Sequence, residues 1–131
     1  MHKVSLLVLF SLASIVCVTG CFSSSTELPN TAKVNGTVTV AGSPARNLSI
    51  TFESEGGQAA FGVTDDSGNY ELTAAAGTKG AEIGVNTVRI ETMLDAPAPA
   101  GYKDPIPAKY NKESTLKVTV EAGENTHNFD L

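Results

Sequence analysis

Only a few residues in this sequence have types that could do chemistry. Cys21 offers a thiol nucleophile, and His127 offers a base or a metal ligand. A zinc site needs three or four His, Cys or carboxylate ligands, and a serine nucleophile needs a histidine and an orienting acid. After residue 20 the chain holds one histidine and one cysteine, with no nucleophile elbow and no glycine-rich phosphate loop. The sequence therefore predicts no catalytic residue, no metal site and no cofactor, and we expect a protein that is not an enzyme.

A run of alternating oxygen-bearing side chains, Asp65, Ser67 and Asn69, has the spacing of a calcium-binding loop. An EF-hand loop that starts at Asp65 would need glycine at its sixth position and glutamate at its twelfth. In this chain Gly68 falls at the fourth position and Ala76 at the twelfth. The sequence Asp-Asp-Ser-Gly therefore favours a type I hairpin turn over a calcium site.

Cys21 ends a segment with the features of a bacterial export signal. Met1-His2-Lys3 supplies a basic start, and residues 4–18 run without a charge. At about 1.5 Å per residue this run is about 22 Å long, shorter than a hydrocarbon core of ~30 Å. It ends in Val18-Thr19-Gly20-Cys21, which resembles the lipobox of bacterial lipoproteins. The resemblance implies that residues 1–20 are removed and that Cys21 carries lipid; the alternative is an uncleaved signal anchor.

The next residues have the composition of a tether. Residues 21–32 are rich in Ser, Thr, Pro and Asn without apolar periodicity, and we expect the folded domain to cover residues 33–131. Phe22 follows the cysteine where lipoproteins kept in the inner membrane usually have aspartate. We therefore expect an exported protein, lipid-anchored in an envelope membrane, the outer favoured over the inner, with its domain in the periplasm or at the cell surface.

The charge balance restricts the partners. Fourteen acidic and nine basic residues give a net charge of −5. Nucleic acid binding needs a basic face that releases counterions, and adhesion to anionic lipid needs basic residues too. We therefore expect no nucleic acid partner, and contact with the membrane only through the lipid at Cys21.

Apolar and polar residues alternate along most of the domain, which is typical of antiparallel strands with one buried face. The apolar residues expected on that face include Phe52, Phe61, Val63 and Tyr70. His127 lies two residues before Phe129 and so faces the same side of the strand, and we expect it at the edge of the core. Seven strands are predicted, over residues 34–40, 48–53, 61–63, 70–74, 87–91, 116–121 and 129–131. Short strands with Gly, Pro and Asp turns between them favour a β-sandwich.

Several segments make this domain similar to a known family. VNGTVTVAGSPARNLSITF, TDDSGNYEL and TVRIE resemble the carboxypeptidase regulatory-like, or transthyretin-like, domain, and the last part, from PIPAKY to NFDL, resembles small lipoproteins of that type in planctomycetes. The resemblance covers Val34 to Leu131. It implies an all-β, seven-stranded antiparallel Greek-key sandwich, transthyretin-like or Ig-like, used as an accessory module. It implies no activity, because the matching motifs are turns and core positions.

The segment from Leu94 to Ser114 interrupts the alternation and contains four of the six prolines. Connections of this length are often functional. Tyr102, Ile106 and Tyr110 are candidate contacts for a partner, beside a basic rim of lysines. The alternative is that Ile106 and Tyr110 fold back and cap the sandwich.

Two functions remain open. The first is a non-enzymatic, membrane-anchored envelope module that binds another envelope protein or spaces components. The second is a carbohydrate or cell-wall binding module, for which the sequence offers no Trp and only three Tyr residues as ring-stacking platforms.

Overall fold

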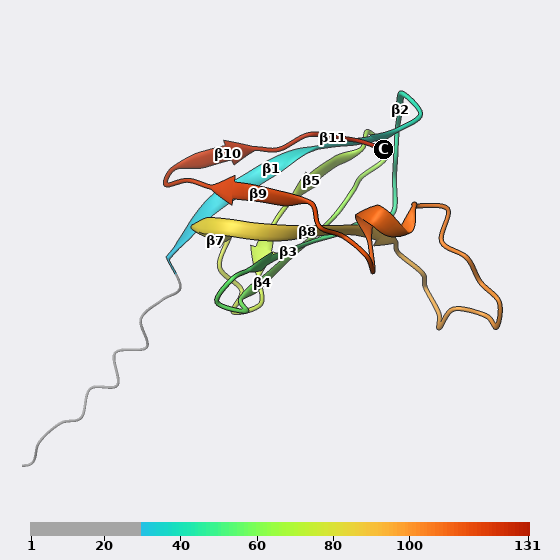
Figure 1. Ribbon diagram of the computed structural model, residues 1–131. Helices are drawn as coiled ribbons and strands as arrows, with labels where there is room; N and C mark the ends of the chain where they lie inside the picture. Colours follow the sequence, from blue (N-terminus) through green and yellow to red (C-terminus); the bar gives the residue numbers. More distant parts are fainter. Residues whose placement is uncertain (1–29) are drawn as a thin grey trace, which may run out of the picture.

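A computed structural model describes residues 30–131, and this part of the chain is all-β (Figure 1). The predicted signal, the lipidation of Cys21 and most of the predicted tether lie outside the described residues. The strands are β1 (Thr31–Val40), β2 (Ser43–Pro44), β3 (Leu48–Ser54), β4 (Ala59–Val63), β5 (Asn69–Glu71), β6 (Thr73–Ala74), β7 (Ala81–Glu82), β8 (Gly84–Thr92), β9 (Lys117–Val120), β10 (Glu124–Thr126) and β11 (Phe129–Asp130). One turn of 3-10 helix, η1, covers Ala108–Tyr110. In residues 30–131 no helix is long and apolar enough to span a bilayer.

The strands form two sheets. In the first, β1 pairs with β2, β5, β7, β10 and β11, and in the second the order is β6-β4-β3-β8-β9. Figure 1 shows β1, β10 and β11 lying over β3 and β8, which gives a sandwich-like arrangement. One core of buried side chains lies between the sheets and includes Val34, Val38, Ile50, Phe52, Leu72, Val88, Ile90 and Val120.

Most strand pairs are antiparallel, as expected, but two pairs in the first sheet correct that expectation. The strands β10 and β11 run parallel to β1, with Val34 beside Asn125 and Val38 beside Phe129. The chain leaves β9 in the second sheet, turns at Gly123, whose φ is +101°, and joins the first sheet beside β1. The Asn125 amide donates to the carbonyl oxygens of Glu121 and Lys33, at 2.8 and 3.2 Å, and so ties this turn to β1. Alternation reports a buried face but not the direction of the neighbouring strand.

Aromatic rings join the two sheets. Phe52 of β3 is fully buried, and its ring centre lies 6.3 Å from that of Phe129 in β11, edge to face. Phe129 stacks in turn on Tyr70 of β5, with 6.3 Å between the ring centres. His127 is half-buried, as expected, with its ring centre 6.0 Å from that of Phe52. Such pairs contribute about 0.5–1.5 kcal/mol beyond the apolar area that they bury.

Tyr70 also holds the C-terminal strands through its hydroxyl. Burial raises the pKa of Tyr70 far above its ordinary value, so the hydroxyl stays protonated at all physiological pH values. It donates a hydrogen bond of 2.7 Å to the carbonyl oxygen of His127. The polar end of a buried ring is thereby satisfied where the chain passes from β10 to β11.

The acidic run forms the expected turn. One carboxylate oxygen of Asp65 accepts hydrogen bonds of 2.9 Å from the backbone amides of Ser67 and Asn69. Gly68 takes a φ of +76°, and its amide donates to the Asp65 carbonyl at 3.0 Å. These contacts are those of a hairpin turn between β4 and β5.

Two expected core residues face outward. Phe61 is 48% exposed and Val63 46%, whereas the buried positions of β4 are Ala60 and Gly62. A β-carbon on Gly62 would lie 2.8 Å from the Glu71 carbonyl oxygen, because the chain at β5 passes close by. Only small residues fit there, and the large ones therefore occupy the outer face.

The domain also begins earlier than expected. β1 starts at Thr31, which pairs with Glu82, and Ala32 is buried beside Ala81. The first strand therefore includes two residues of the segment predicted as a tether. Thr31 and Ala32 alone do not show the alternation that predicts a strand. They become part of β1 because β7 pairs with them.

Candidate functional site

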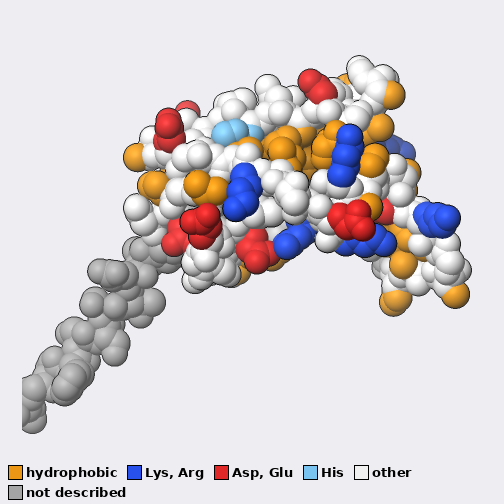
Figure 2. Space-filling view, in the orientation of Figure 1, with side chains coloured by type: hydrophobic (Ala, Val, Ile, Leu, Met, Phe, Trp, Pro, Cys, Tyr) orange, Lys and Arg blue, Asp and Glu red, His pale blue; other side chains and the backbone are white. Residues whose placement is uncertain are grey.

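The segment after β8 consists of two parts with different environments. Residues 93–103 are all exposed, whereas residues 104–114 lie back against the sheets and include the buried Ile106 and Asn111. We call residues 93–103 the clasped loop. Figure 2 shows it projecting beyond the sheets, with hydrophobic side chains at its tip.

Asp104 closes the base of the clasped loop. Its carboxylate accepts hydrogen bonds of 2.8 Å from the Thr92 amide and the Thr92 hydroxyl, and of 2.9 Å from the Ile106 amide. Burial of the carboxyl raises its pKa, but these three hydrogen bonds together outweigh that effect and hold the pKa of Asp104 below its ordinary value. The two ends of the loop are therefore joined by a charged group that stays ionised near neutral pH.

The packed part is fixed by further contacts. The Asn111 side-chain amide donates to the Ile106 carbonyl oxygen at 3.0 Å, and the Ser114 hydroxyl donates to the Val88 carbonyl oxygen. Ile106 is 4% exposed and belongs to the core. These contacts hold the segment in one place although it has almost no regular secondary structure.

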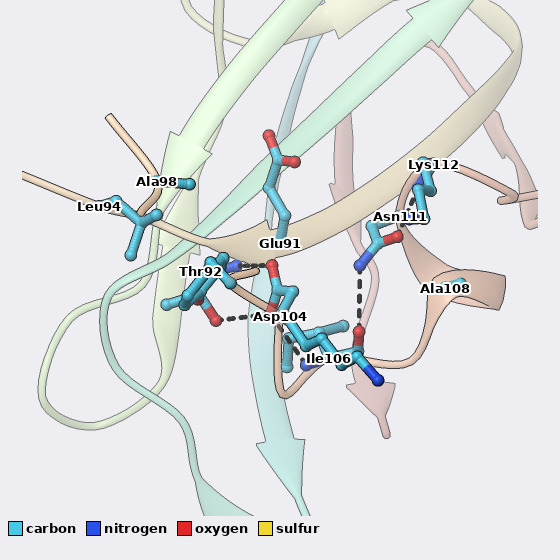
Figure 3. A pocket seen from close by; sticks show the side chains of 11 residues that line it. Glu91, Thr92, Leu94, Ala98, Asp104, Ile106, Ala108, Asn111 and Lys112 are labelled. Atoms are coloured by element: carbon cyan, nitrogen blue, oxygen red, sulfur yellow. Dashed lines mark hydrogen bonds between the residues drawn. The ribbon is translucent and has the colours of Figure 1, made fainter. Parts of the chain in front are cut away.

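A hollow of about 510 Å³ lies between the clasped loop, the end of β8 and η1 (Figure 3). It is open to solvent. The residues that line it are Glu91, Thr92, Leu94, Ala98, Tyr102, Lys103, Asp104, Ile106, Ala108, Asn111 and Lys112. Figure 3 shows the Asp104 carboxylate turned to Thr92, while the Glu91 carboxylate points away from that cluster. Hollows of this size hold small ligands or short peptide segments.

The lysines of this segment differ from the other cations. Every Lys and Arg of residues 30–131 outside the segment forms an ion pair with a carboxylate. Within the same described range, Lys103, Lys109 and Lys112 form none. Lys109 lies over the Tyr110 ring, 4.8 Å from its centre, while Lys103 and Lys112 line the hollow. Two lysines that form no ion pair within residues 30–131 therefore line one hollow, together with the carboxylates of Glu91 and Asp104.

The three residues predicted as partner contacts have different environments. Tyr102 is 38% exposed and lines the hollow. Ile106 is buried and cannot serve as a surface anchor, and Tyr110 is half-buried against the core. These two residues therefore pack as the capping alternative describes, because each lies in the part of the segment that folds back onto the sheets.

Sequence reasoning missed the residues that shape the hollow. Asp104 is the most important of them, and its only local signal is the following proline, since Asx-Pro pairs favour turns. Its partner Thr92 is twelve residues away. Alternation predicts Glu91 on the outer face of its strand, but not that a hollow lies beside it. Leu94 and Asn111 gave no signal, because each acquires its place only when the segment folds back.

The chemistry offered here is that of recognition. The lining combines two lysines, the two carboxylates of Glu91 and Asp104, and a tyrosine ring with the neutral residues Ile106 and Ala108. No group of three or more His, Cys, Asp or Glu side chains with metal-binding geometry occurs in residues 30–131. No protein-family model, curated protein or solved structure matches this chain.

Replacing Asp104 with asparagine is expected to destabilise the protein by roughly 1–2 kcal/mol at pH 7, because an amide cannot accept from all three donors. A folded-state pKa below the unfolded value means that ionised Asp104 adds stability above about pH 4, and that this contribution is lost as the pH falls through the folded-state pKa. Thermal melts at pH 7 and pH 3 measure this contribution. The difference in melting temperature between the wild type and Asp104→Asn should be smaller at pH 3 than at pH 7.

The matched control is Asp95→Asn, a nearby change in the exposed loop. It should leave the melting temperature within about one degree of the wild type, since surface changes usually cost little. Equal melting temperatures for Asp104→Asn and Asp95→Asn at pH 7 would show that the Asp104 contacts do not stabilise the fold.

Proposed function

We propose that this protein is a membrane-anchored, non-enzymatic lipoprotein of the cell envelope, and that its domain is an accessory module that binds another envelope protein. The anchor is supported by the apolar run that ends in Val18-Thr19-Gly20-Cys21. Export, lipidation at Cys21 and residence in the outer rather than the inner membrane belong to this proposal.

The finer description of the fold is part of the same proposal. In it, the sheets form a Greek-key sandwich of the carboxypeptidase regulatory-like type. Its seven main strands are β1, β3, β4, β5 with β6, β8, β9 and β11, which correspond to the seven segments of alternating sequence. The observed parallel pairing of β11 with β1 has to be accommodated in any such topology.

The observation that carries the binding function is the position of the clasped loop. β1 begins at one end of the sheets, beside the start of β8, and the clasped loop follows the other end of β8 (Figure 1). Nine residues of strand separate these ends by about 30 Å. The loop and its hollow therefore lie at the end of the domain opposite the point where the chain from Cys21 would enter it, and this leaves them accessible to a partner.

Replacing Cys21 with serine tests the anchor. The expected result is an unacylated precursor that keeps residues 1–20, because the hydroxyl cannot take the place of the thiol in the lipid transfer. Intact-mass measurement of the membrane fraction gives the answer for both chains. The matched control is Cys17→Ser, which changes a cysteine within the apolar run and should leave the mature lipidated mass intact. A wild-type mature chain that starts elsewhere and carries no acyl mass would contradict the proposal.

A further inference from the structure

We propose that the hollow beside the clasped loop binds a carboxylate-bearing peptide segment of the partner protein, with Lys103 and Lys112 pairing with its carboxylates. The inference rests on the proposed function, because it names the chemistry of the partner. In the bound state Tyr102 and Leu94 cover the apolar atoms of the partner's peptide.

Charge is the first support. In residues 30–131, the five Lys and Arg side chains outside residues 94–114 already form ion pairs. A carboxylate ligand would therefore have to displace an intramolecular partner to reach any of them. Lys103 and Lys112 need no such exchange. They are also placed together at one hollow on a protein of net charge −5. The hollow also contains the carboxylates of Glu91 and Asp104, so its formal charges cancel. The attraction for a ligand carboxylate therefore comes from the two ammonium groups, which form no ion pair within residues 30–131.

The acidic groups of the hollow limit which carboxylate-bearing peptides can bind. The Asp104 carboxylate is occupied by three hydrogen bonds and is turned to Thr92, so it does not take up the lysines (Figure 3). Glu91 is exposed and repels a dense run of acidic residues. The segment that fits best therefore carries separated carboxylates among small neutral residues.

The site is preorganised. Asp104 fixes the loop ends, Asn111 fixes the wall on the η1 side, and Pro97 and Pro99 restrict the backbone of the loop tip. Binding at a site that is already ordered loses less conformational entropy, so that modest contacts suffice for measurable affinity. A volume of about 510 Å³ holds a few residues of an extended chain rather than a folded element.

A glycan fits this lining less well. Sugar rings bind by stacking on flat, exposed aromatic side chains, and Tyr102 is the one aromatic residue that lines the hollow. Ammonium groups would contribute little to a neutral sugar. The hollow therefore favours the peptide, and glycan binding becomes an outcome that the experiment can reveal.

The test measures fluorescence anisotropy of a labelled short peptide of alternating Glu and Ala with the full chain in neutral detergent micelles. We expect saturable binding that weakens with added salt, and at least tenfold weaker binding of the same peptide with Gln in place of Glu. Lys103→Gln and Lys112→Gln should each raise Kd about threefold, and the double variant about tenfold.

Lys109→Gln is the matched control, since Lys109 belongs to the same segment and makes the same charge change but does not line the hollow. It should leave Kd unchanged. Equal binding of the Glu and Gln peptides, no binding at millimolar concentration, or an equal effect of Lys109→Gln would each overturn the proposal. Cell-wall glycan strands, freed of stem peptides, that displace the Glu peptide from the wild type would also overturn it, because the hollow would then be a glycan site. A non-lipidated Cys21 would leave these measurements unaffected, so the two failures are distinguishable.

Discussion

Phe52→Ala is expected to lower the free energy of unfolding by about 3–5 kcal/mol, as the deletion of a buried ring does. Phe52 is 0% exposed and extends from β3 in the second sheet to Phe129 in the first. The change removes the ring and leaves a void between the sheets, and it also removes the contact with His127. Because a domain of this size has roughly 5–15 kcal/mol of stability in total, most of that stability could be lost.

Urea unfolding of residues 30–131, followed by circular dichroism, measures the effect. Thr51→Ala is the control on the neighbouring position of β3, where the side chain lies on the outer face and is half-buried. It should cost less than about 1 kcal/mol. Similar costs for the two variants would contradict the assignment of Phe52 to the contact between the sheets.

The sequence predicts the strands well where large apolar residues mark the buried face. Leu48, Ile50 and Phe52 alternate with polar neighbours, and all three are buried in β3. The same reasoning is wrong for β4, because Phe61 and Val63 are larger than Ala60 and Gly62 but lie on the outer face. The inward positions are small there because of the close approach of Glu71, a contact between strands that alternation cannot report.

The candidate site was predicted only in outline. The prolines located the segment, since proline cannot continue a central strand. The division into an exposed loop and a packed part depends on Asp104 reaching Thr92 and on Ile106 entering the core, and both are tertiary contacts. Tyr102, Ile106 and Tyr110 have similar apolar character in sequence, so their different burial could not be predicted from residue type.

Gly36→Ala is expected to destabilise the protein by about 3 kcal/mol or more. A β-carbon at residue 36 would lie 1.8 Å from the His127 carbonyl oxygen, where the chain runs alongside β1 from β10 to β11. The C-terminal strands must move away to admit the methyl group, and overpacking of this kind costs roughly 1–3 kcal/mol. That movement also separates His127 from the Tyr70 hydroxyl, and a buried hydroxyl without a partner adds roughly 1–3 kcal/mol.

Three further variants separate these two causes in the same urea measurement. Gly56→Ala is the matched control, since its β-carbon would meet no atom nearer than 3.5 Å, and it should cost less than about 1 kcal/mol. Tyr70→Phe removes the hydroxyl alone and should cost about 1 kcal/mol. The double variant Gly36→Ala with Tyr70→Phe should then cost less than the sum of the single changes, because both disrupt the same hydrogen bond to His127. Additive costs would mean that alanine at residue 36 is accommodated without moving His127. A Gly36→Ala cost as small as that of Gly56→Ala would contradict the close approach of His127 to Gly36.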